Sequence, residues 1–174
     1  VDILISGVNM AKVYRDDDID LSVLEGKTVS ILGYGNQGRS QAQNLRDNGI
    51  NVVIGNRGDD YRALAGDDGF EASDIPTATT KGDVVMVLLP DETQASVLPV
   101  DVFPHLMPGA TLVFAHGYSV FYKEIDPPEG HDITLLAPKM IGAAVRELFT
   151  AGAGFPSLVA VDRDSTGRAW DTVL

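Results

Sequence analysis

A glycine-rich segment, Gly33-Tyr34-Gly35-Asn36-Gln37-Gly38, constrains the fold of this chain more than any other feature. It follows a strand-like apolar run at Thr28–Leu32 and leads at once into a helix-like stretch at Gln37–Asn48. A GxGxxG pattern alone is a weak signal, with a structural glycine turn as the alternative, but its position between a strand and a helix is typical of dinucleotide-binding domains. The three glycines allow a tight turn, the approach of a pyrophosphate to the backbone, and close packing of the helix on the sheet.

Short apolar runs recur along the chain, with helix-like stretches between several of them. The runs are rich in Val, Ile and Leu with little polar alternation, which indicates strands buried on both faces. The alternation of strands and helices predicts an α/β fold, with a Rossmann-like, doubly wound and mainly parallel sheet. The predicted strands are Thr28–Leu32, Asn51–Ile54, Asp83–Leu89, Thr111–Phe114, Ile133–Ala137 and Ser157–Val161, and the predicted helices are Gln37–Asn48, Tyr61–Asp67, Gly142–Thr150 and Ser165–Leu174.

The length of the chain fits one domain. A chain of 174 residues can bury a sizeable core and is short for two domains. We expect residues 1–20 to form a polar lead-in arm and residues 21–174 to form the nucleotide-binding domain. The last helix-like stretch has no capping Gly or Pro after it, so we expect this chain to be part of a longer protein.

Charge and cysteine content argue against several classes of function. The formal net charge of −12 would repel nucleic acid and anionic membrane surfaces. No apolar run approaches the roughly 18 residues that a membrane span needs. The chain has no cysteine, which excludes disulfides, thiolate metal sites and cysteine nucleophiles, and predicts a cytoplasmic location.

A charged turn after the second predicted strand bears on the choice of cofactor. In dinucleotide-binding domains an acidic residue at this point binds the free 2′-hydroxyl of NAD, whereas an arginine suits the 2′-phosphate of NADP. This chain offers both, because Arg57 is followed by Asp59 and Asp60. Arg57 can stack on adenine or pair with a phosphate, while the two carboxylates would repel a phosphate and accept from ribose hydroxyls. A solvated charged turn is the alternative.

Two chemically active side chains follow predicted strands. His116 comes after Thr111–Phe114, and Lys139 comes after Ile133–Ala137. Ligands of open α/β sheets bind at the carboxyl ends of strands, where a histidine can transfer a proton and a lysine can supply charge to a substrate oxygen. The alternatives are a structural histidine bonded to a loop carbonyl, and a surface lysine.

Four motifs follow one another along the chain. They are Gly33–Gly38, Leu89-Pro90-Asp91-Glu92-Thr93-Gln94, Leu112-Val113-Phe114-Ala115-His116-Gly117-Tyr118 and Ala137-Pro138-Lys139. In this order they resemble the N-terminal Rossmann domain of the ketol-acid reductoisomerase (acetohydroxy-acid isomeroreductase) family, and the resemblance spans residues 13–174. It implies conversion of 2-acetolactate or 2-aceto-2-hydroxybutyrate to 2,3-dihydroxy acids, with NAD(P)H and magnesium, in the biosynthesis of branched-chain amino acids such as valine and isoleucine.

The resemblance also implies roles for individual residues. His116 takes the position of the family's active-site histidine, and we assign Lys139 a catalytic role beside it from its own position at a strand end. Asp91 and Glu92 look like a paired-carboxylate acid/base site, but the resemblance puts them at the cofactor, so we assign them no catalytic role. It places the magnesium carboxylates and the contacts of a homo-oligomer in a helical C-terminal domain absent here, so we expect no metal ligand in this chain. The cofactor-binding residues that it implies are Tyr34, Gly35, Asn36, Gln37, Arg57, Asp91, Glu92, Thr93, Gln94 and Gly142. The glycine-rich pattern adds Gly33 and Gly38, and the charged turn adds Asp59 and Asp60.

Two departures from the family pattern bear on cofactor and subgroup. Family members have hydroxyl side chains after the position of Arg57 to hold the 2′-phosphate, whereas this chain has Asp59 and Asp60 in a loop one residue shorter. The cofactor is therefore NADP or NAD, and the acidic loop favours NAD. The family's Ala-Pro-Lys-Gly-Pro-Gly becomes Ala137–Gly142, which indicates a divergent subgroup.

Two other functions fit the same fold. One is another oxidoreductase of the hydroxyacid dehydrogenase kind, and the other is a non-catalytic nucleotide-binding module. Intact His116 and Lys139 at strand ends argue against the module, because a sensor has no need of them.

Overall fold

The apolar runs of the sequence pair side by side into one sheet. The structure, a computed structural model, describes residues 12–174, and within them a seven-stranded sheet has the strand order β3-β2-β1-β4-β5-β6-β7. The strands from β1 to β6 are parallel to their neighbours, and β7 is antiparallel to β6. The predicted Rossmann-like, mainly parallel α/β fold is thus confirmed. The strands are β1 (Thr28–Leu32), β2 (Asn51–Gly55), β3 (Glu71–Ser73), β4 (Val84–Val87), β5 (Thr111–Phe114), β6 (Asp132–Pro138) and β7 (Ser157–Arg163).

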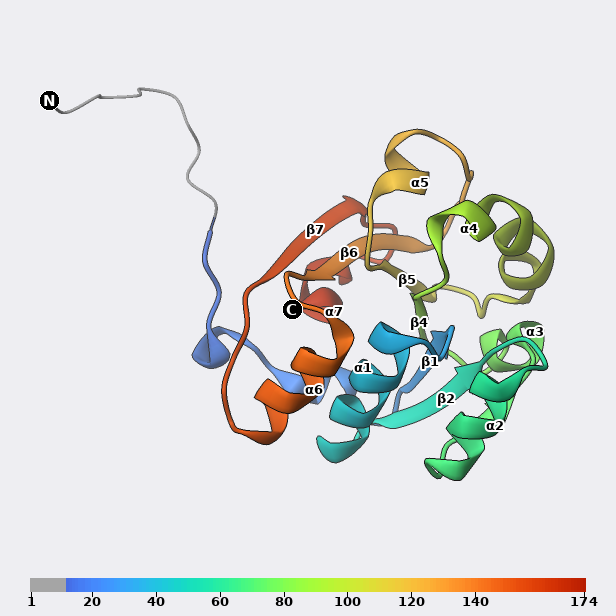
Figure 1. The fold of residues 1–174 in the computed structure, drawn as a ribbon. Coiled ribbons are helices and arrows are strands. Elements are labelled where there is room, and N and C mark those ends of the chain that lie inside the picture. The colour runs from blue at the N-terminus through green and yellow to red at the C-terminus, as the bar shows by residue number, and fades with distance from the viewer. Residues whose placement is uncertain (1–11) are drawn as a thin grey trace, which may run out of the picture.

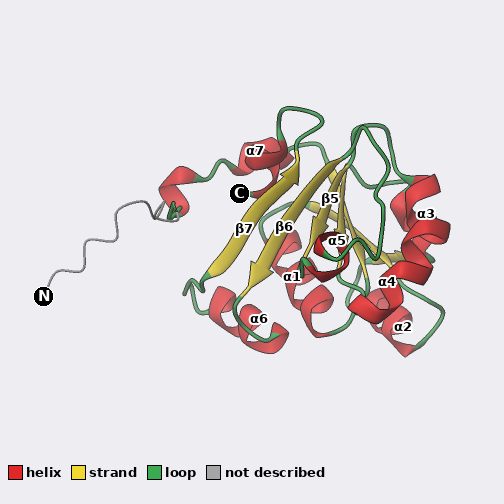
Figure 2. Cartoon of the chain, turned by 90° about the horizontal axis from the view of Figure 1, so that it is seen from above, coloured by secondary structure: helices red, strands yellow, loops and turns green. Residues whose placement is uncertain are grey.

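Helices cover both faces of this sheet (Figures 1 and 2). Successive residues of a strand enter different cores: Ile31 packs in the core with α1 and α2, and Leu32 packs in the core with α3 and η3. The α-helices are α1 (Asn36–Asp47), α2 (Asp60–Asp67), α3 (Ile75–Thr79), α4 (Asp91–Val97), α5 (Tyr118–Phe121), α6 (Gly142–Thr150) and α7 (Ala169–Val173). The short helices of other types are η1 (Asp16–Asp18), η2 (Leu21–Leu24), η3 (Leu98–Val102) and η4 (Phe103–His105).

The order of the strands reverses beside β1. The chain moves from β1 outward to β2 and β3, and then returns to the other side of β1 to place β4. The loops that leave β1 and β4 therefore turn toward opposite faces of the sheet. Such a switch point opens a crevice at the carboxyl ends of the strands, and ligands of open α/β sheets bind there.

The last strand differs from the prediction. We expected Ser157–Val161 to be buried on both faces, but β7 is an edge strand with alternating exposure, and Leu158 is 54 % exposed. The physical reason is the antiparallel pairing with β6, which leaves the other edge of β7 without a strand neighbour. An apolar run indicates that a strand can be buried, but it does not indicate how many strands and helices cover it.

The last helix is also shorter than predicted. We expected Ser165–Leu174, and α7 begins only at Ala169. The buried carboxylate of Asp132 accepts hydrogen bonds from the backbone N–H groups of Ser165, at 2.8 Å, and Thr166, at 2.9 Å. These bonds hold the two residues in a turn, and the positive φ of Gly167 delays the helix further.

Part of the predicted lead-in arm lies against the domain. Residues 1–11 lie outside the described part of the chain. The ring of Tyr14 lies 6.2 Å from that of Trp170 in α7, measured between centroids. Just after the arm, Leu24 of η2 packs against the core that contains α1. No helix within residues 12–174 has the length and apolar character that a membrane crossing needs.

The Asp132 carboxylate gives a first testable prediction. Asp132→Ala should lower the free energy of unfolding by about 3 kcal/mol, because two backbone N–H groups and the hydroxyl of Thr166 lose a charged acceptor. Asp162→Ala is the matched control, since Asp162 is exposed on β7. Urea denaturation of both variants measures the effect. Equal stability losses would show that the Asp132 bonds do not hold the turn after β7.

Candidate cofactor and active site

The residues that the sequence singled out gather at one edge of the sheet. The phosphate loop follows β1, and the charged turn follows β2. Asp91, His116 and Lys139 follow β4, β5 and β6 in turn. Because these strands are parallel neighbours, their carboxyl ends meet at the same edge. The fold thus brings the predicted cofactor and catalytic residues to the crevice beside β1.

Each of the three glycines of the phosphate loop is required or allowed for a different structural reason. Gly33 has a φ of +98°, in the left-handed region that favours glycine. A Cβ at Gly38 would lie 1.9 Å from the carbonyl oxygen of Gly33, so only glycine lets α1 start so close to the loop. A Cβ at Gly35 would meet nothing within 4 Å. The backbone at Gly35 is therefore open, and a pyrophosphate can approach it there.

A second helix begins beside the phosphate loop. A Cβ at Gly142, the first residue of α6, would lie 2.0 Å from the carbonyl oxygen of Asn36. The side chain of Gln37 donates to the carbonyl oxygen of Met140 at 2.8 Å. The helices α1 and α6 run side by side from this point (Figure 1). Their positive N-terminal ends lie close together, an arrangement that favours an anionic group.

The side chain of Tyr34 lies in the core and does not face the crevice. It is 1 % exposed, and its ring lies edge-on to that of Phe70. Its hydroxyl donates to Asp68 at 2.8 Å, and Arg39 donates to the same carboxylate at 2.7 Å. Burial, followed by the bond to Asp68, raises the pKa of Tyr34, and the guanidinium of Arg39 lowers the pKa of Asp68. The side chain of Tyr34 therefore anchors the loop, and its backbone N–H is also bonded within the protein, because it donates to Oδ1 of Asn56 at 3.1 Å.

The charged turn after β2 is closed by an ion pair. The Nε of Arg57 donates to Oδ2 of Asp59 at 2.6 Å, and the arginine side chain is 83 % exposed. Asp59 also caps α2, because its Oδ1 accepts from the N–H of Tyr61 at 3.0 Å. The ion pair and the cap keep the pKa of Asp59 below its ordinary value. Asp60 is exposed in the first turn of α2, where a negative charge favours the helix.

The structure pairs two residues that the sequence analysis kept apart. Nδ1 of His116 hydrogen-bonds to Oδ2 of Asp91, and the ring of His116 stacks with that of Tyr118. The pair lies at the ends of the neighbouring strands β4 and β5. Their positions directly after two adjacent strands were the signal in the sequence. Asp91 therefore touches the predicted catalytic histidine, a contact that the family pattern did not imply.

The rest of the motif after β4 divides between structure and surface. Gln94 is buried, and its amide donates to the carbonyl oxygen of Leu89 at 3.0 Å and to Asp91 at 3.2 Å. The hydroxyl of Thr93 donates to the carbonyl oxygen of Pro90. Glu92 is exposed. Gln94 thus holds Asp91 in place, and the carboxylate of Glu92 is open to solvent.

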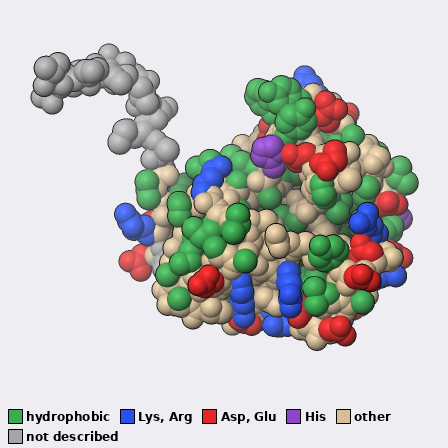
Figure 3. All heavy atoms as spheres, viewed as in Figure 1, with side chains coloured by type: hydrophobic (Ala, Val, Ile, Leu, Met, Phe, Trp, Pro, Cys, Tyr) green, Lys and Arg blue, Asp and Glu red, His purple; other side chains and the backbone are tan. Residues whose placement is uncertain are grey.

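Lys139 has an exposed side chain at the end of β6. Its backbone N–H donates to the carbonyl oxygen of Pro156 at 2.9 Å. Apolar side chains gather beyond the crevice, over α5 (Figure 3). They include Tyr118, Phe121 and Tyr122, which are 46 %, 77 % and 61 % exposed.

In the part of the chain that the structure describes, no group of three or more His, Asp or Glu side chains lies together as a metal site would.

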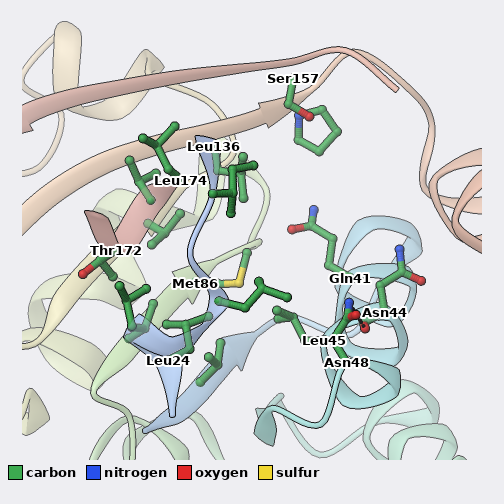
Figure 4. Close-up of a pocket in the computed structure, with 18 of the residues that line it drawn as sticks. Leu24, Gln41, Asn44, Leu45, Asn48, Met86, Leu136, Ser157, Thr172 and Leu174 are labelled. Atoms are coloured by element: carbon green, nitrogen blue, oxygen red, sulfur yellow. Dashed lines mark hydrogen bonds between the residues drawn. The ribbon is translucent and has the colours of Figure 1, made fainter. Parts of the chain in front are cut away.

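An apolar cavity lies on the face of the sheet that α1 covers. It has a volume of about 370 Å³ and is bordered by α1, α7 and η2 (Figure 4). Leu24, Met86 and Leu136 point into it. None of the predicted cofactor or catalytic residues lines it. The cavity is separate from the crevice at the strand ends.

The chain matches known proteins over nearly its whole length. The family described as "Acetohydroxy acid isomeroreductase, NADPH-binding domain" matches residues 23–174. A curated ketol-acid reductoisomerase (NADP(+)) of Caldivirga maquilingensis is 51 % identical over 160 residues, which cover 92 % of this chain and 49 % of the relative. The chain therefore spans about half the length of that relative.

Solved structures agree with this match. The structure of an NADH-preferring ketol-acid reductoisomerase from an uncultured archean superposes with a TM-score of 0.92 at 41 % identity, covering 94 % of this chain and 51 % of the other. The 3-hydroxyisobutyrate dehydrogenase of Mycobacterium tuberculosis superposes with a TM-score of 0.65 at 18 % identity, covering 84 % and 50 %. The second likeness shows a shared fold alone.

The open space at Gly35 gives a second prediction. Gly35→Val should abolish dinucleotide binding and leave the melting temperature within a few degrees, because an added Cβ meets no protein atom within 4 Å and the side chain fills the approach of the pyrophosphate. Calorimetric titration with NADH and a thermal melt measure the two effects. Gly154→Val is the control, since Gly154 also has open space around it and is remote from the loop. Unchanged affinity in Gly35→Val would place the cofactor elsewhere.

Proposed function

Because this chain belongs to the acetohydroxy acid isomeroreductase family, we propose that it is the cofactor-binding half of a ketol-acid reductoisomerase. The substrates are 2-acetolactate or 2-aceto-2-hydroxybutyrate, and the products are 2,3-dihydroxy acids of branched-chain amino-acid biosynthesis. The observation that carries the proposal is the Asp91–His116 pair, which lies on the same sheet edge as an open phosphate loop in a chain 51 % identical to a named member.

The crevice has the parts that a bound nicotinamide dinucleotide requires. Arg57 would hold the adenosine end, and the open backbone at Gly35, between the starts of α1 and α6, would hold the pyrophosphate. Asp91 and His116, at the ends of β4 and β5, would lie on the side of the nicotinamide. The cofactor, when bound, supplies the hydride that reduces the ketone.

The residues of this chain hold and move protons around the reacting oxygen. Because Asp91 contacts Nδ1 of His116, the proton on that nitrogen is fixed and Nε2 remains free to exchange a proton with substrate or water. Lys139, at the end of the next strand, supplies positive charge to a substrate oxygen as negative charge develops. The magnesium carboxylates belong, by the family resemblance, to the half of the relatives that lies beyond this match.

The proposed cofactor is NADH at least as much as NADPH. The named relatives differ on this point, since one carries NADP(+) in its name and another is NADH-preferring. In this chain Asp59 already pairs with Arg57, so a 2′-phosphate would have to displace a carboxylate and remain close to its charge. A ribose hydroxyl instead finds an acceptor in the same carboxylate.

The remaining expectations belong to the whole enzyme. We propose a cytoplasmic enzyme that acts on small 2-aceto-2-hydroxy acids and forms a homo-oligomer through its other half. The shared fold with a hydroxyisobutyrate dehydrogenase at 18 % identity does not support a dehydrogenase function, because one fold serves many reactions. The family match also makes a non-catalytic module the weaker alternative.

The proposed reaction is tested in the full-length protein. It should consume acetolactate in the presence of magnesium and NADH, and His116→Ala should lower kcat and kcat/KM together by at least about 100-fold while the Kd for NADH changes little. Residues 1–174 alone should bind NADH without turnover. An inactive full-length protein would refute the proposed reaction. Intact turnover with weakened cofactor binding in His116→Ala would make His116 a binding residue.

The cofactor preference is tested separately by titration. The wild-type protein should bind NADH at least as tightly as NADPH at both low and moderate salt, and Asp59→Asn should raise NADPH affinity by about tenfold. The asparagine keeps the helix cap but frees Arg57 and removes a negative charge. Asp67→Asn, at the opposite end of α2, is the control for the change in charge. A clear NADPH preference of the wild type would make Arg57 a phosphate clamp.

A further inference from the structure

One buried polar side chain connects the phosphate loop to the charged turn. Asn56 is the residue between β2 and Arg57, and it is 7 % exposed. Its backbone N–H donates to the carbonyl oxygen of Ser73 at 3.0 Å, so its position continues the pairing of β2 with β3. A buried amide is costly unless its donor and acceptor groups both find partners.

Both ends of the Asn56 side chain are bonded, to two different loops. Oδ1 accepts from the backbone N–H of Tyr34 in the phosphate loop at 3.1 Å. Nδ2 donates to Oδ1 of Asp59 at 2.8 Å and to the carbonyl oxygen of Arg57 at 3.1 Å. An N–H requires an acceptor and a carboxylate requires a donor, so one orientation of the amide fits.

These bonds form a continuous network from the phosphate loop to the charged turn. It runs from the Tyr34 N–H through Asn56 to the carboxylate of Asp59, whose other oxygen holds the guanidinium of Arg57. The Tyr34 end of this network is anchored, because the Tyr34 side chain is buried and bonded to Asp68. The carboxylate of Asp59 is consequently held by a side chain that belongs to the sheet, in addition to its cap on α2.

We propose that Asn56 is a positioning residue for cofactor specificity, which holds Asp59 against Arg57 and so disfavours a 2′-phosphate. This proposal rests on the proposed nicotinamide function. Binding of NADPH requires the guanidinium to leave Asp59 and the carboxylate to turn away from the phosphate. The Asn56 amide opposes that turn, because it would lose its charged acceptor. A cofactor with a free 2′-hydroxyl can bind without this movement of Arg57 and Asp59.

The test is the ratio of the two affinities rather than either affinity alone. Asn56→Leu keeps about the same volume and removes both bonding groups without adding charge. It should raise the affinity for NADPH relative to NADH by about threefold to tenfold, the net effect of one ordinary hydrogen bond. Asn51→Leu is the matched control, since Asn51 is exposed at the opposite end of the same strand. Titrations of the full-length protein and of both variants with NADH and with NADPH give the dissociation constants for these ratios.

A second background separates positioning from general support of the fold. In Asp59→Asn the negative charge is already gone, so adding Asn56→Leu should leave the ratio unchanged. An equal loss of both affinities in Asn56→Leu, or a change of ratio that persists in the Asp59→Asn background, would overturn the proposal. A wild type that prefers NADPH would refute the proposed cofactor choice. The dissociation constants of the single and double variants would still show whether the effect of Asn56→Leu depends on Asp59. Failure to bind either cofactor would refute the nicotinamide function itself.

Discussion

The site depends on one packing constraint, the absence of side chains where two helices and the phosphate loop meet. Gly38 lets α1 begin against the carbonyl of Gly33, and Gly142 lets α6 begin against the carbonyl of Asn36. Any larger residue at either point would separate the helix from the loop by more than an ångström, because the nearest atoms are backbone atoms. The positive ends of both helices are thus brought to the open backbone at Gly35. The proposed place of the pyrophosphate follows from this arrangement.

Around the phosphate loop and the strand ends beside it, three carboxylates are already paired within the protein. Asp68 binds Arg39, Asp59 binds Arg57, and Asp91 binds His116. An exposed ion pair of this kind adds little to the stability of the fold. Its main effects here are to orient the two side chains and to change the local charge that a ligand meets. Pairing at Arg57 lowers the attraction for a phosphate. Pairing at His116 fixes one ring nitrogen and frees the other.

The fold was largely readable from the sequence, and the exceptions have physical causes. The long apolar runs became β1, β2, β4, β5 and β6, because strands buried by helices on both faces carry a strong signal. The three-residue strand β3 carries too few apolar residues for such a pattern. Edge strand β7 has the composition of a buried strand, and its antiparallel direction depends on the turn before it. The helix α4 begins at Asp91, within a motif that the sequence analysis assigned to the cofactor without a secondary structure.

The sequence by itself determined the fold class, the glycine-rich loop and the sheet edge where the candidate site residues lie. These are properties of residue order: glycine spacing sets the loop, and a residue that follows a parallel strand must lie at its carboxyl end. Only the tertiary structure decided which side chains touch. It turned Tyr34 into the core, placed Asp91 on His116, and joined Tyr34 to Asp59 through Asn56. Such contacts join residues 22, 25 or 34 positions apart in the chain, and their geometry depends on strand order and helix packing, which no local pattern contains.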